Sequence, residues 1–159
     1  MSRASAPTGD PPAERGGTVP QDQIAAQDTP TASSISPTPQ MALRRYALAY
    51  TNWTASSLPA TQRRLASLAV GAAKLTAEEI AASNSAVVEL AANHVQNKGV
   101  VLAIAPGRGP AIGQWVVVTQ EQTTGAGPYA GLPSTLHVTF ARVRRVDRGW
   151  IVWEWSPRT

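Results

Sequence analysis

The chain has 159 residues and no cysteine, and its 14 Lys and Arg residues against 10 Asp and Glu residues give a formal net charge of +4. The lack of cysteine excludes disulfides, thiolate nucleophiles and cysteine-based zinc sites. This length allows one domain with additional segments. The sequence contains no apolar run of about 18 residues that would cross a membrane.

The first 40 residues differ in composition from the rest of the chain. They hold seven of the thirteen prolines, ten Ser or Thr residues and no aromatic residue. Such a segment cannot bury enough apolar surface to offset the entropy lost on ordering, so we predict that residues 1–40 form a disordered leader or linker. The single folded domain is then 41–159, with twelve Lys and Arg residues against six acidic residues and a net charge of +6. A basic domain favours acidic partners.

The first predicted helix lies in 41–57. Here Leu43, Tyr46, Tyr50 and Trp53 follow one another at spacings of three, four and three residues. Because a helix has 3.6 residues per turn, these four side chains share one helix face.

Two more helices are predicted from their end signals. The second begins near Pro59, which suits the first turn of a helix, and ends near Gly71. The stretch "TAEE" from Thr76 to Glu79 has the pattern of a capping box, so the third helix begins there. Gly99 marks the predicted end of this helix.

After these helices the hydrophobic pattern changes to that of strands. Four segments are rich in apolar and β-branched residues, and glycine- and proline-containing turns separate them: 100–105, 114–123, 134–146 and 150–155. Short connections favour antiparallel neighbours. The predicted fold class is therefore α+β, with three N-terminal helices packed on one face of a four-stranded antiparallel sheet.

The segment 134–146 alternates in polarity. Its more polar face includes His137, which we expect to be solvent-facing or simply hydrogen-bonded. Alternation places Thr135, His137, Thr139 and Ala141 on this face, and Leu136, Val138 and Phe140 on the other.

Three of the five tryptophans fall in the last strand, in "DRGWIVWEWSPR". Burial of one tryptophan removes about 150–250 Å² from water, so a small domain can hardly leave all three exposed. Alternation predicts that Ile151 and Trp153 pack on the helices and that Trp155 closes the end of the core. Trp150, beside the turn, is then the surface residue.

The stretches "YTNW", "QRRLASLAVGAA" and "RGWIVWEWSP" together resemble the nuclear transport factor 2-like superfamily, whose fold is a cystatin-like α+β cone. The pattern of Gly149, Trp150, Val152 and Trp155 is common on the last strand of that fold, and the resemblance covers roughly residues 41–157. It implies that the four-stranded sheet is curved, wraps around the helices and leaves a pocket.

More narrowly, the chain resembles periplasmic-type domains of conjugation and type IV secretion machines, including the TcpC-like conjugal transfer proteins of Gram-positive bacteria. In such proteins a linker joins this domain to a membrane helix; residues 20–40 resemble the linker, and the membrane helix is missing here. The resemblance implies a scaffold that oligomerises and contacts other subunits, with no catalytic residue to carry over. The chain is cytoplasmic if Met1 is its natural start, and extracytoplasmic or at the cell surface if an upstream membrane helix has been removed.

An alternative is that the cone holds a small molecule or a substrate. Enzymes of this fold use pocket acids, histidines or tyrosines as general acids and bases. Glu154 is expected to pair across strands with Arg142 or Arg144 instead, and the two histidines have no metal-ligand spacing, so no catalytic residue, metal or cofactor is assigned. The pocket candidates are Tyr46, Tyr50, Trp53, Trp115, Glu121 and His137.

A dense run of arginines precedes and enters the last turn. It can dock an acidic protein partner or, as a further alternative, a nucleic-acid backbone, with nearby tryptophans for base stacking. The candidates for partner contact are Arg142, Arg144, Arg145, Arg148 and Trp150. The favoured hypothesis is a non-enzymatic interaction domain that associates with copies of itself in a bacterial conjugation or secretion apparatus.

Overall fold

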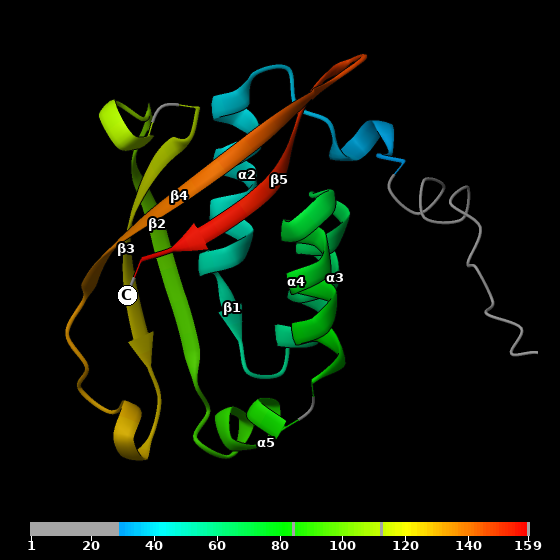
Figure 1. Cartoon of the computed structure of the whole chain (residues 1–159). Coiled ribbons are helices and arrows are strands. Elements are labelled where there is room, and N and C mark those ends of the chain that lie inside the picture. The colour runs from blue at the N-terminus through cyan, green and yellow to red at the C-terminus, as the bar shows by residue number, and fades with distance from the viewer. Residues whose placement is uncertain (1–28, 84, 112, 159) are drawn as a thin grey trace, which may run out of the picture.

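The computed structural model describes residues 29–158 except 84 and 112 (Figure 1). Most of the predicted leader, 1–28, lies outside the described residues. Residues 29–40 of that segment are ordered and begin the fold: a short 3-10 helix, η1, spans Ala32–Ser34. Ser36 then pairs with Trp150 of the last strand through two main-chain hydrogen bonds of 2.8 and 2.9 Å. A side chain at Gly149 would collide with the Ser36 carbonyl, so this close pairing requires glycine at position 149.

The helices are four rather than the predicted three among the described residues. Their bounds are α2 Pro39–Thr51, α3 Leu58–Ser67, α4 Gly71–Ala82 and α5 Ser85–Ala92. The first two lie where the periodicity places them, and the Thr38 hydroxyl accepts a hydrogen bond from the Met41 amide to cap α2.

The predicted capping box at Thr76 is wrong, because Thr76 and Glu79 lie inside α4. This helix begins five residues earlier, at Gly71, whose φ of +57° suits glycine. The preceding residue is held by a hydrogen bond of 2.9 Å from the Val70 amide to the Val152 carbonyl. A contact to a distant strand therefore sets the start of α4, and local capping chemistry does not.

The strands form one antiparallel sheet in the order β1-β2-β3-β4-β5. Their bounds are β1 Trp53–Thr54, β2 Gln96–Pro106, β3 Trp115–Thr124, β4 Thr135–Val146 and β5 Gly149–Pro157. The α+β class and the four long strands are confirmed. The additional strand β1 arises because α2 ends at Thr51, so that Trp53, predicted on the helix stripe, enters the sheet instead.

The sheet curls around α2, which packs against all four long strands, while α3 and α4 form a pair beside β5 (Figure 1). The core lies between α2, the other helices and the inner face of the sheet. Its fully buried side chains come from both layers and include Leu43, Leu65, Val95, Val117, Ile151 and Val152.

The polar face of β4 turns inward, which sequence alternation alone did not reveal. Thr139 is 3% exposed and Ala141 1% exposed beneath α2, whereas Leu136 on the apolar face is 67% exposed. His137, also on the inward-turned side, is half-buried, and its ring nitrogen lies 2.8 Å from the Thr135 hydroxyl. The expectation of a hydrogen-bonded histidine is confirmed, but the apolar face is the one that meets solvent.

The last strand also departs from simple alternation. A bulge shifts the β4–β5 register between Arg142 and Val143, and Trp153 is the additional residue on β5. Ile151 is buried and Trp155 packs on the core, as predicted. Trp150 packs on the core as well but stays partly exposed, so its assignment as a surface residue holds only in part.

Candidate functional site

Aromatic side chains fill the interior of the cone where the pocket is predicted. The ring of Trp155 lies 5.0 Å from the ring of Tyr46 and 5.5 Å from that of Tyr50, measured between centroids. The cavity that remains beside them is only about 70 Å³. Liquid water occupies about 30 Å³ per molecule, so this space suits a very small occupant.

The six predicted pocket residues do not meet in this cavity. Tyr46 and Tyr50 line it, together with Gln62 of α3 and Trp155. The remaining four lie elsewhere on the sheet: Trp53 on β1, Trp115 and Glu121 at opposite ends of β3, and His137 on β4. The alternation of the sequence could not show that Trp155 would occupy the space between the two tyrosines.

Burial changes the chemistry of the two tyrosines. Removal from water raises the pKa of Tyr46, and the nearby Tyr50 raises it further. Burial also raises the pKa of Tyr50, with a smaller contribution from the negative charge of Glu121. Burial therefore favours the neutral, protonated form of both phenols. The Tyr46 hydroxyl donates a long hydrogen bond of 3.5 Å to the Ala73 carbonyl.

Glu121 belongs to a hydrogen-bonded network on the inner face. Its carboxylate accepts hydrogen bonds of 2.8 Å from the Asn97 amide and from the Thr119 hydroxyl. The Asn97 amide also donates to the Thr51 carbonyl, at 2.8 Å, which ties the end of α2 to β2. These contacts satisfy polar groups that the curled sheet buries, so Glu121 has a structural explanation.

Among the described residues we looked for metal-binding clusters and for membrane-spanning helices. Within 29–158, apart from the two omitted positions, no group of three or more His, Cys, Asp or Glu residues is placed to hold a metal ion. None of the helices in this part of the chain is both long and apolar enough to span a bilayer.

The predicted arginine run lies on the β4–β5 hairpin, where each guanidinium but one contacts a cross-strand neighbour. Arg142 lies 3.6 Å from the Glu154 carboxylate, which confirms the predicted cross-strand pair. The guanidinium of Arg144 lies 5.6 Å from the ring centroid of Trp153. Arg145 lies in the same way over Trp150, at 5.7 Å. The hairpin therefore presents a basic surface in which arginines already cover the tryptophan faces.

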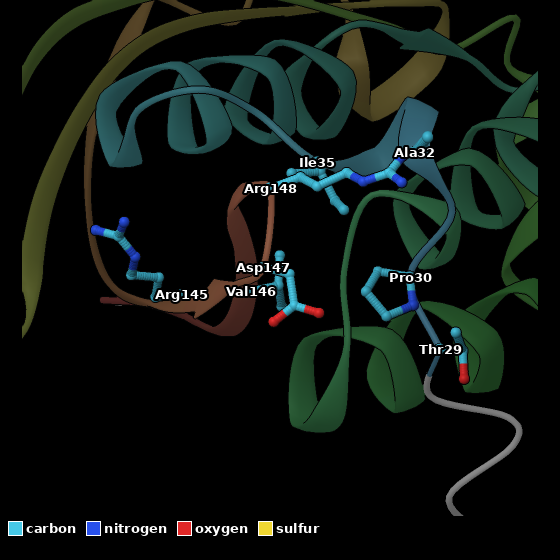
Figure 2. Close-up of a pocket in the computed structure, with 8 residues that line it drawn as sticks. All are labelled: Thr29, Pro30, Ala32, Ile35, Arg145, Val146, Asp147 and Arg148. Atoms are coloured by element: carbon cyan, nitrogen blue, oxygen red, sulfur yellow. The ribbon is translucent and has the colours of Figure 1, made fainter.

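A groove of about 440 Å³ separates the hairpin turn from the N-terminal segment (Figure 2). Figure 2 shows Arg148 extending past Ile35 toward Ala32, and Asp147 directed toward Pro30 on the other wall. The sequence did not indicate this groove, because one wall comes from residues 29–35, whose composition is typical of disorder. It is lined by Thr29, Pro30, Ala32, Ile35, Arg145, Val146, Asp147 and Arg148.

A second surface, the outer sheet surface, is the solvent-facing side of β2, β3 and β4. Cross-strand neighbours make it continuous: Val118 pairs with Val138, and Val116 pairs with Phe140. Among its members the exposed fractions reach 54% for Val100, 52% for Leu102 and 67% for Leu136. No described helix covers this side. We define the outer sheet surface as Val100, Leu102, Val116, Val118, Leu136, Val138 and Phe140.

The comparisons with known proteins define the fold. No protein-family model and no curated protein matches the chain by sequence. The structure of the VirB8 protein of Agrobacterium tumefaciens is similar, with a TM-score of 0.55 and 10% sequence identity, over 75% of this chain and 88% of that one. The chain thus shares the fold of the VirB8 structure, in agreement with the fold that the sequence motifs indicated.

Proposed function

We propose that this chain is a non-enzymatic scaffold domain of a bacterial conjugation or secretion apparatus, and that it associates with copies of itself and with other subunits. The outer sheet surface is the observation that carries the proposal. Contiguous apolar patches on soluble proteins mark contact sites, because exposure to water is unfavourable unless a partner covers them. The fold shared with VirB8, a type IV secretion component, supports this choice of apparatus.

The filled interior supports a role in contact rather than in catalysis. Small-molecule sites usually occupy about 300–1,000 Å³, whereas the cavity beside Tyr46 and Tyr50 has about 70 Å³. Glu121, the acid predicted for that pocket, is hydrogen-bonded within the sheet.

The arginines of the hairpin suit an acidic protein segment better than a nucleic acid. Single-stranded nucleic acids bind through bases stacked on exposed aromatic rings, and arginines cover the rings of Trp150 and Trp153 here. We assign the groove between Arg148 and the N-terminal segment to an acidic stretch of another subunit. Reversing the charge with Arg148→Glu should weaken that contact and leave the free energy of unfolding almost unchanged, because Arg148 is exposed.

The decisive experiment is genetic. Deletion of the gene in its native host should reduce conjugative transfer or secretion, and the wild-type gene should restore it. A gene encoding Leu136→Lys and Val138→Lys should fail to restore it, whereas Val88→Lys, at a position 70% exposed on α5, should restore it fully. A deletion strain that transfers and secretes normally would contradict the proposal.

A further inference from the structure

We infer that the free edge of β2 is the self-association surface: it pairs antiparallel with β2 of a second copy of this chain, so that two sheets become one. This inference rests on the proposed function and names the surface that self-association uses. The pairing would add main-chain hydrogen bonds along the edge and bring two outer sheet surfaces side by side.

The edge is open because β1 is very short. This strand pairs with β2 only at Gln96 and Asn97. The Asn52 side chain extends the pairing by one position, with its amide 3.0 Å from the Gly99 carbonyl and its oxygen 3.3 Å from the Gly99 amide. Beyond Gly99, no described strand pairs with β2 on that side, so its outward main-chain groups up to Pro106 lack a strand partner.

The opposite edge of the sheet is partly covered by main-chain pairing. The other edge strand, β5, is covered at two places, by an antiparallel bridge from Ser36 to Trp150 and by a parallel bridge from Ala69 to Val152. Proteins usually protect exposed edges with lysine, proline or a bulge. The β2 edge has a bulge between Val101 and Ala103, but its sequence, "GVVLAIA" over 99–105, has no charge and no proline. The bulge leaves the Leu102 side chain 52% exposed.

The distribution of charge favours a second copy of this chain as the partner that pairs with the β2 edge. The domain carries a net charge of +6 over 41–159, so two copies repel each other wherever their arginines meet. The densest arginine run lies on β4 and the β4–β5 turn, away from the β2 edge. An antiparallel pairing centred on Leu102 would set Lys98 opposite Pro106 of the second copy, so no like charges face each other. An uncharged apolar edge is complementary to itself and offers an acidic partner nothing to attract it.

The first test is the mass in solution of the full chain, by size-exclusion chromatography with light scattering. We expect the wild type to form a dimer, and Val100→Lys with Leu102→Lys to raise its dissociation constant by at least about tenfold, or about 1.4 kcal/mol. The matched control is Leu75→Lys with Val88→Lys, at positions 60% and 70% exposed on α4 and α5, which should leave the constant unchanged. Circular dichroism establishes that each variant is folded.

The second test uses the lack of native cysteine. Leu102→Cys provides a single thiol, and a short bifunctional maleimide should link two such chains, whereas Leu75→Cys chains should stay unlinked. The β2 assignment is wrong if the wild type is a dimer, the variant with Val100→Lys and Leu102→Lys is still a dimer, and Leu102→Cys chains are not linked. In that case self-association itself stands. A monomeric wild type would overturn both the assignment and self-association, and the transfer assay would still test the scaffold role separately.

Discussion

The two faces of the sheet do not follow the usual rule that apolar side chains are buried and polar side chains are exposed. On the inner face, the polar residues Thr119 and Thr139 are 2% and 3% exposed. On the outer face, the apolar residues Leu136 and Val138 are 67% and 38% exposed. Residues that are neighbours along β4 thus have burial opposite to their hydropathy.

The difference shows that packing geometry, rather than side-chain polarity, selects the buried face here. The helix α2 crosses the concave side of the curled sheet and leaves room for small side chains such as Thr139 and Ala141. The polar groups there find partners, as in the hydrogen bond from Thr119 to Glu121. Larger apolar side chains are placed on the convex side, where a partner can cover them.

The largest effect should come from truncating the inner layer. Leu43 on α2 is fully buried, so Leu43→Ala should lower the free energy of unfolding by about 2–5 kcal/mol, through lost burial and the cavity left behind. Leu136→Ala removes the same atoms from the outer face and should change it by less than about 0.5 kcal/mol. Urea denaturation of both variants measures the contrast, and equal losses would mean that the two faces do not differ in this way.

Much of this fold could be predicted from local sequence. The periodicity of Leu43, Tyr46 and Tyr50 located α2, and the turns located the four long strands. The start of α4 could not be predicted, because the Val70 amide is held by Val152, far away in the sequence. The order in residues 29–38 depends in the same way on the Ser36–Trp150 pairing.

The candidate site was predicted less well for a related reason. Composition located the arginine run and its pairing with Glu154, which need only neighbouring strands. The bulge after Arg142 could not be predicted, and it moves the tryptophans out of simple alternation. The outer sheet surface was missed because alternation identifies two faces but cannot say which one the helix covers.

A second prediction concerns the polar network of the inner face. Asn97→Ala removes the donor to Glu121 and to the Thr51 carbonyl, and leaves both acceptors in a poorly hydrated site. We expect a loss of about 1–3 kcal/mol in the free energy of unfolding. The control is Gln120→Ala, next to Glu121 but exposed on the outer face, which should be nearly silent. A silent Asn97→Ala would mean that the network contributes no stability.

A third prediction concerns the pH dependence of the free energy of unfolding, to which the buried Tyr46 should contribute. The pKa of Tyr46 is raised in the folded state, so its contribution to stability is complete below the unfolded value of about 10 and is lost as pH rises from there toward the folded value. In that window Tyr46 alone should lower the free energy of unfolding by about 1.4 kcal/mol per pH unit. Tyr46→Phe should reduce the measured slope by about this amount and leave the part that comes from Tyr50, whereas Tyr129→Phe, in the loop before β4, should keep the whole slope. Urea titrations between pH 9 and about 11 provide the measurement.

The smallest effect on stability should come from the outer face itself. Val118 and Val138 lie opposite each other there, and changing both to Thr keeps the β-branched shape while making the surface polar. Loss of this cross-strand pair should cost only about 0.2–1 kcal/mol in the free energy of unfolding. If the outer sheet surface serves a partner, the same variant should restore transfer or secretion at least about tenfold less well than the wild type in the deletion strain. Full restoration by the folded variant would show that the apolar side of the sheet is a consequence of the fold and not a contact surface.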